Sequence, residues 1–212
     1  GVPLQCRKYH GRVVGIAVQS RAKQRSHRAL FAHLHNHSEY SLLDGLSSVK
    51  DMAQRAKELG QSALALTDHG VMYGAIDFYR ACKDVGIKPI IGMEGYVAQS
   101  SRLTRNPADR SPYHMTVLAK NEVGYGNLLK LASKAQLEGF YYRPRMDREI
   151  LEEHSDGLVI LSGCLSGEIG THIVGGQMDK ARETVDWYRQ VFGDDYYLEV
   201  MWHERIPDQL TM

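Results

Sequence analysis

The sequence has few cysteines and no long apolar run. Its three cysteines, Cys6, Cys82 and Cys164, are an odd number, lie far apart and include no C-x-x-C pair. This pattern argues against a disulfide framework and for a reducing compartment. The apolar run at residues 13–18 has six residues, far fewer than the roughly 20 that cross a bilayer. We therefore expect a cytoplasmic protein without a membrane partner.

Acidic residues are absent from the first 30 positions, which carry seven of the 26 Lys and Arg residues. The other 182 residues therefore hold 19 basic and all 25 acidic side chains. A mildly acidic domain has no broad basic surface of the kind that neutralises phosphates. Contact with nucleic acid would then need a local site or a partner domain, and the sequence does not identify its residues.

Two regions differ in composition. Residues 1–29 are Arg-rich and non-periodic, like an organelle transit peptide, and we expect a disordered extension. Residues 30–212 form the predicted domain, and a hydrophobic content of 43% for the whole chain is ample for a core.

Strand and helix patterns alternate along this domain. Strands are predicted at 29–37, 62–70, 87–97, 113–120, 156–164 and 195–203, and helices at 47–60, 73–86, 121–137 and 177–193. Residues 99–112 have the composition of a loop. Such alternation favours an α/β fold with a mostly parallel sheet or barrel.

Three histidines at alternate positions open the domain, in "HLHNHSEYSLLDG". On a straight strand His33, His35 and His37 would share one face. Three adjacent imidazoles repel when protonated and need partners for both nitrogens when neutral. A metal ion resolves this conflict, and Asp44 in the following loop adds an oxygen ligand.

Other predicted strands carry ligand-type residues at their ends. These are His69, Glu94, His114 and Cys164, with His114 at the start of its strand and the others near the C-terminal end. With the histidines and Asp44 they exceed the ligand number of one ion. We therefore predict a centre with two or three ions, suited to displacement at a phosphoryl group.

The stretch "GFYYRPR" at residues 139–145 allows two interpretations. Tyr141 and Tyr142 could stack on bases while Arg143 and Arg145 bind phosphate. Alternatively, the segment is a packed loop with solvated arginines.

Several motifs together resemble a known family. The segments "FAHLHNHSEYSLLDG", "ALALTDHGVMYGAIDFYRACKDVGIKPIIGMEGYV" and "LVILSGCLSGEI" resemble the N-terminal PHP (polymerase and histidinol phosphatase) domain of the bacterial DNA polymerase III alpha subunits. The resemblance runs from about Leu30 to Met212. It implies a distorted (β/α)7 barrel related to the TIM barrel, with up to three zinc, manganese or iron ions and 3′–5′ proofreading exonuclease activity.

Residue by residue, the resemblance implies a set of metal ligands. They are His35, His37, Asp44, His69, Glu94, His114 and Cys164. Glu94 would bridge ions and, with Asp44, serve catalysis. His33 stands where many members of the superfamily have Asp, so we interpret it as a neighbour of the ligands. Asp68 would orient an imidazole.

The chain departs from the family pattern in two ways. A late D-x-H motif, which supplies the last two of the family's nine ligands, is missing after Cys164. The extension at 1–29 is also unusual for the family. The resemblance therefore implies a truncated barrel, inactive as an isolated fragment. It further implies that magnesium, primer–template DNA, the sliding clamp and other replisome subunits are bound through regions outside this chain.

Two other functions fit the same metal chemistry. One is a phosphomonoesterase of the histidinol-phosphatase type. The other is a non-catalytic, metal-stabilised scaffold that braces a polymerase. The motifs shared with the polymerases favour the nuclease over the phosphatase, and the seven ligand-type residues present favour catalysis over a scaffold.

Overall fold

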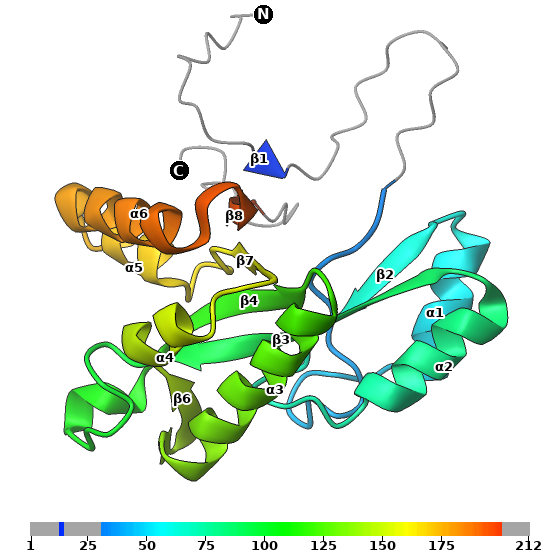
Figure 1. Cartoon of the computed structure of the whole chain (residues 1–212), viewed down its shortest axis with the longest axis horizontal. Coiled ribbons are helices and arrows are strands. Elements are labelled where there is room, and N and C mark those ends of the chain that lie inside the picture. The colour runs from blue at the N-terminus through cyan, green and yellow to red at the C-terminus, as the bar shows by residue number, and fades with distance from the viewer. Residues whose placement is uncertain (1–12, 15–30, 201–212) are drawn as a thin grey trace, which may run out of the picture.

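The computed structural model describes residues 13–14 and 31–200 and shows a mixed α/β fold (Figure 1). The strands are β1 (Val13–Val14), β2 (Ala63–Leu66), β3 (Lys88–Val97), β4 (Tyr113–Ala119), β5 (Phe140–Tyr141), β6 (Arg143–Met146), β7 (Leu158–Leu161) and β8 (Tyr196–Glu199). The helices are α1 (Val49–Glu58), α2 (Ala75–Val85), α3 (Glu122–Leu137), α4 (Arg148–Glu153), α5 (Glu168–Val174) and α6 (Met178–Phe192), with short 3-10 turns η1 (Pro107–Arg110) and η2 (Gly193–Asp195). Apart from Val13–Val14, the predicted extension lies outside the described residues.

The sheet is mixed, whereas the sequence predicted a mostly parallel one. Its order is β1-β8-β7-β4-β3-β6-β5, with β2 paired to β3. Strand β4 runs antiparallel to both β3 and β7, while β2–β3, β3–β6, β7–β8 and β1–β8 are parallel. The connection from β3 to β4 explains the difference, because it contains only η1 and no crossover helix. A parallel neighbour would need such a crossover.

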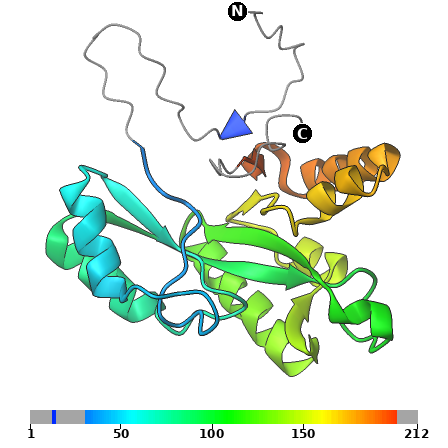
Figure 2. The ribbon, with the colours of Figure 1, turned by 180° about the vertical axis from the view of Figure 1, so that it is seen from behind.

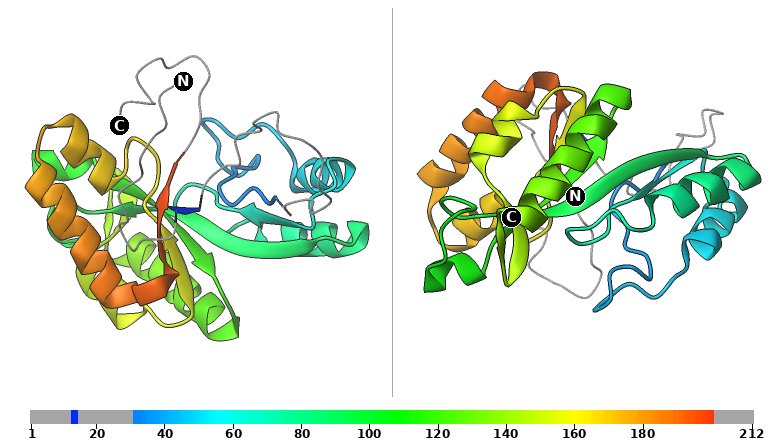
Figure 3. Two further views of the ribbon diagram at one scale, coloured as in Figure 1. Left: turned by 90° about the horizontal axis from the view of Figure 1, so that it is seen from above. Right: turned by 60° about the horizontal axis from the view of Figure 1, so that its bottom comes forward.

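Strand β3, with ten residues the longest described strand, pairs with three others, β2, β4 and β6 (Figure 3). Strand β4 pairs along one edge of it. The opposite edge is shared by β2 at residues 88–91 and β6 at residues 96–97. Between these two, His69 forms an isolated bridge with Glu94. The pairings within the described residues do not close into a ring, so the (β/α)7 barrel stays a prediction.

Four helices form two groups at the ends of the sheet, and α3 and α4 lie between them (Figure 1). Helices α1 and α2 pack beside β2, while α5 and α6 lie together near β8. The helices predicted at 47–60 and 73–86 are confirmed as α1 and α2. The Ser48 side chain accepts from the Asp51 amide at the start of α1, and Gly86 ends α2 with φ 75°. Among the described residues, no helix has the length and apolar character needed to cross a membrane.

Two buried clusters make up most of the core. The larger one joins β3, β4, β6 and β7 to α3, α4 and α6. The smaller one joins α1, α2 and β2, and it buries Cys82, as expected for an apolar position on a helix. The polar cluster described below lies where β2, β3 and β4 come together, between these two apolar regions.

The predicted first strand is wrong in its conformation. Residues 31–37 accept two backbone hydrogen bonds, from Ala65 N of β2 to His33 O and from Thr67 N, just after β2, to Asn36 O, but the chain bends at His35. Figure 2 shows this segment crossing the sheet. The sequence also gave no sign of β5, β6, α4 or α5, which have two to seven residues each. Elements this short leave little periodicity to detect.

Candidate metal centre

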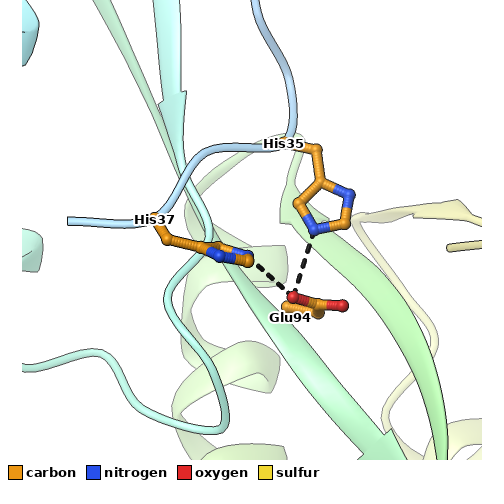
Figure 4. A group of neighbouring side chains, drawn as sticks. All are labelled: His35, His37 and Glu94. Atoms are coloured by element: carbon orange, nitrogen blue, oxygen red, sulfur yellow. Dashed lines mark ion pairs between the residues drawn. The ribbon is translucent and has the colours of Figure 1, made fainter. Parts of the chain in front are cut away.

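Glu94 is the centre of a buried group of histidines. It is 1% exposed, and four imidazoles contact its carboxylate. His35 Nε2 lies 3.2 Å, His37 Nε2 2.7 Å and His69 Nδ1 2.9 Å from Oε2, while His114 Nδ1 lies 2.8 Å from Oε1. Figure 4 shows His35 and His37 pointing at the carboxylate from the segment before α1. The two oxygens thus face different sets of nitrogens.

Sheet register brings these side chains together. The register that pairs Leu66 of β2 with Ile91 of β3 continues past the end of β2 and pairs His69 with Glu94. On the other edge, Glu94 is paired with Thr116 of β4. His114 lies two residues earlier on β4, and because β4 is antiparallel, the start of β4 lies beside the carboxyl end of β3. This direction explains why His114 shares the site although it begins its strand.

Asp44 reaches the same group from an exposed loop. Its Oδ2 lies 2.8 Å from His69 Nε2 and 3.3 Å from His37 Nδ1. The loop folds back tightly, because a Cβ on Gly45 would stand 1.7 Å from the Ser38 carbonyl oxygen. Asp44 therefore links two imidazoles on the side opposite Glu94.

Asp68 contacts this loop, whereas the sequence predicted contact with an imidazole. Its carboxylate accepts from Ser38 N at 2.6 Å, Ser38 Oγ at 2.8 Å and Ser41 Oγ at 2.7 Å. Ser41 Oγ in turn accepts from the His69 amide at 3.2 Å. Asp68 thus positions the backbone of His69 and the Asp44 loop through two serines.

His33 lies apart from the group, against the expectation that it neighbours the ligands. Its ring packs edge-on against Phe31, with centroids 4.7 Å apart, and it is exposed. The bend at His35 breaks the alternation that would have placed His33 beside His35 and His37. The shared-face argument holds for a straight strand and fails here.

Cys164 contacts the group through His114. It follows β7, and its Sγ accepts from the Ser166 amide at 3.4 Å. Burial alone would raise the pKa of the Cys164 thiol, but hydrogen bonds from His114 and Ser166 lower it. A lowered thiol pKa favours the thiolate, which is the form that binds metals.

The charges of the group depend on one another. Burial alone would raise the pKa of Glu94, but its histidines hold that pKa well below its usual range. Burial alone would likewise lower the pKa of His35, but Glu199 and Glu94 raise it to about 10. Hydrogen bonds to Cys164 and Glu94 raise the pKa of His114 to about 9. The carboxylates therefore favour a positive charge among the imidazoles.

Three buried polar atoms of this group have no hydrogen-bond partner. His37 Nε2, His69 Nδ1 and Glu94 Oε2 converge, yet the geometry gives none of them a hydrogen bond. Buried polar atoms without partners are costly, and nitrogen and oxygen lone pairs aimed at one region are what a metal ion satisfies. The residues present therefore fit a metal.

The ligand-type atoms form three overlapping groups. They are His35, His37 and Glu94; His37, Asp44 and His69; and His69, Glu94 and His114. Within each group the atoms lie within 4.8 Å of one another. Shared members place the groups side by side, as in a centre with more than one ion.

Glu199 belongs to the site and was missed. Its Oε1 lies 2.8 Å from His35 Nδ1, the nitrogen that faces away from Glu94. Thr116 Oγ1 lies 3.1 Å from the same nitrogen. Glu94 was singled out as a ligand-type residue near the end of a predicted strand. Glu199 at the end of β8 fits the same rule, which would have found it if applied to every strand. His203, a further ligand-type residue at the end of the strand predicted at 195–203, lies outside the described residues.

The fold thus carries a group of His, Asp and Glu side chains around Glu94 that could hold a metal ion. The PHP domain family model matches residues 33–203, and the chain belongs to that family.

The relatives of the chain among curated proteins are DNA polymerase III alpha subunits. That of Borreliella burgdorferi is 48% identical over 186 residues, covering 87% of this chain and 16% of the relative. That of Treponema pallidum is 51% identical over 179 residues, covering 83% and 15%. The chain thus spans less than a fifth of the length of these relatives. The family match and the identity to these relatives confirm the resemblance seen in the sequence motifs.

Solved structures are more distant. One is a candidate metal-dependent phosphoesterase from Bifidobacterium adolescentis, 10% identical, with a TM-score of 0.45 and coverage of 82% of this chain and 88% of that one. Similarity at this level says nothing about function.

Proposed function

We propose that this chain is the PHP domain of a bacterial replicative DNA polymerase and that, as part of the complete protein, it hydrolyses phosphodiester bonds at DNA 3′ ends. Its relatives in sequence support the first part. The second rests on one observation, the convergence of His37 Nε2, His69 Nδ1 and Glu94 Oε2 without hydrogen bonds. Primer–template DNA, the sliding clamp, other replisome subunits and the magnesium of the polymerase reaction would be bound by other parts of the longer protein.

The proposed ligands lie in two groups, one facing each carboxylate oxygen of Glu94. Its Oε2 faces His35, His37 and His69, while Oε1 faces His114, so the carboxylate can serve two ions at once. Asp44 would complete one side and Cys164 the other. Two or three divalent ions, zinc, manganese or iron, would lower the pKa of a bound water and neutralise charge on the phosphate.

Asp44 has the access that a catalytic carboxylate needs. Its side chain is 49% exposed, whereas that of Glu94 is 2% exposed. Both histidine contacts use Oδ2, which leaves Oδ1 without a hydrogen bond among the described residues. Oδ1 can therefore orient an attacking water and accept its proton. Glu94, which is out of solvent, instead fixes the imidazoles around it.

The test compares two substrates with the complete protein and manganese. One is a primer–template with a 3′ mismatch, and the other is histidinol phosphate. We expect removal of the mismatched nucleotide, loss of that activity in Glu94→Gln, and little effect of His33→Gln as the matched control. Faster turnover of histidinol phosphate would support the phosphatase. Bound metal without turnover of either substrate would support the scaffold.

A further inference from the structure

A polar pocket adjoins the histidine group. It has a volume of about 440 Å³, within the range of about 300–1,000 Å³ typical of ligand pockets. Its lining includes Tyr96, Arg110, Ser111, His114, Arg143 and Ser166. No Asp or Glu lines it, although residues 31–212 carry a net negative charge. The lining therefore favours an anionic ligand.

Arg110 and Arg143 are not neutralised by the protein. Among the described residues, no carboxylate oxygen lies within 4.0 Å of either guanidinium. Each instead lies over an aromatic ring, Arg143 5.7 Å from the centroid of Tyr96 and Arg110 5.0 Å from that of Tyr142. Both arginines are exposed, so their charges can be used by a ligand.

Aromatic contacts join this pocket to the proposed metal centre. The Tyr96 ring stacks on His69 with centroids 6.1 Å apart and an angle of 15°. It meets His114 edge-on at 5.1 Å, and His114 itself lines the pocket. A ligand in the pocket would thus lie directly beside the imidazoles around Glu94.

The hairpin of β5 and β6 presents Arg143 to the pocket. Tyr141 pairs with Arg143, so Tyr142 alone makes the turn, with φ 60°. Such a backbone angle is uncommon for a bulky side chain and is often found at functional positions. Tyr142 is 59% exposed, and its ring contacts Arg110 and Tyr141.

Arg145 has a structural role, so of the two interpretations of residues 139–145 the packed one applies to this arginine. It is fully buried and donates to the carbonyl oxygens of Gly139, Arg102 and Thr104. Its guanidinium also lies 5.3 Å from the centroid of Tyr141. Tyr141 and Arg145 therefore brace the hairpin, and the residues left for a ligand are Tyr142 and Arg143.

We propose that this pocket binds the nucleotide next to the scissile phosphodiester, with Arg110 and Arg143 binding that nucleotide's own phosphate. The inference rests on the proposed function and names its substrate class, a polynucleotide end with at least two phosphates. A phosphomonoester has one phosphate, which would lie at the metal ligands and leave these arginines without an anion. A polynucleotide supplies the second phosphate, and guanidinium is well suited to bind it.

The test measures binding without hydrolysis. Titration calorimetry on the complete protein carrying Glu94→Gln compares the dinucleotide TpT with pTpT, which has an added 5′ phosphate. We expect that phosphate to improve affinity about tenfold, as for hydrogen bonds to charged groups. The improvement should vanish when Arg110→Ala and Arg143→Ala are combined. It should survive Arg55→Ala, an exposed arginine on α1, and largely survive Arg143→Lys.

Three results would overturn the proposal: no binding of either dinucleotide, equal affinities for both, or a 5′-phosphate effect that persists in the double variant. Unchanged melting temperatures would show that the exposed substitutions leave the fold intact. Failure of the proposed function looks different, since the unsubstituted protein would then not hydrolyse DNA even if the phosphate effect were present.

Discussion

Two buried carboxylates, Glu94 and Asp147, have opposite kinds of partners. Asp147 accepts from the Arg102 guanidinium and amide, the Ile150 amide and Ser101 Oγ, and it caps α4. Each of these groups donates a hydrogen bond to the Asp147 carboxylate. Glu94 faces imidazole nitrogens, and one of its oxygens has no hydrogen bond.

The difference separates a structural cluster from a functional one. Arginine and amide N–H groups have no lone pair for a metal, so the Asp147 cluster can only hold the chain in place. Imidazoles can exchange a proton for a metal ion, so the Glu94 cluster can be completed by a ligand. Burial and charge alone do not distinguish the two clusters, and the type of partner does.

The largest effect is expected for Glu94→Gln. The amide keeps the shape but removes the charge that the proposed ions share. We expect mismatch removal to fall about a thousandfold, equivalent to about 4 kcal/mol of transition-state stabilisation. Elemental analysis of the unsubstituted complete protein, purified without chelator, should find about two or more transition-metal equivalents. One equivalent or none would contradict a centre with several ions.

Asp147→Ala should instead reduce stability. It leaves the buried Arg102 guanidinium with only Glu138 and Glu149 and removes the cap of α4. We expect a loss of about 3 kcal/mol in the free energy of unfolding, measured by urea denaturation of the 212-residue chain. Metal content should stay unchanged. A fall in bound metal would erase the proposed distinction between the two clusters.

A histidine pair tests the edge of the Glu94 cluster. His35 contacts both Glu94 and Glu199, whereas His33 contacts neither. We expect His35→Ala to weaken metal affinity about a hundredfold, or about 2.7 kcal/mol, and His33→Ala to leave it nearly unchanged. Competition with a chelator measures both. Equal losses would mean that the bend at His35 does not exclude His33 from the site.

Local patterns predicted the positions of the longer elements but not their directions. The helices predicted at 47–60 and 73–86 were found because caps such as Ser48 and Gly86 are encoded within a few residues of the helix ends. The antiparallel direction of β4 depends on the path of residues 98–112, whose loop composition carries no direction. The sequence named His114 as a candidate ligand, and the antiparallel direction of β4 explains why it lies beside Glu94.

The predicted site residues fall into those that the structure brings together and those that it places elsewhere. The structure brings His35, His37, Asp44, His69, Glu94 and His114 together, and Cys164 contacts His114. Asp68 was placed by its adjacency to His69, and His33 by its position in the family pattern. The structure instead sets Asp68 against two serines of the loop and separates His33 from the group by the bend at His35. Glu199 was missed because the strand-end rule was not applied to β8; its contact with His35, 164 residues away along the chain, is visible only in the structure.

Glu199→Gln is expected to have the smallest effect and to test the outer part of the site. If His35 binds metal through Nε2, its Nδ1–H donates to Glu199, which fixes the ring and makes it a better ligand. Glutamine can still accept that hydrogen bond but lacks the charge. We therefore expect metal affinity to fall about tenfold, or about 1.4 kcal/mol, less than for His35→Ala. Glu58→Gln, an exposed change on α1, is the matched control for lost charge, and chelator competition reads both. An unchanged affinity in Glu199→Gln would show that His35 is held by Thr116 and the backbone alone, and that the functional cluster ends at Glu94's own contacts.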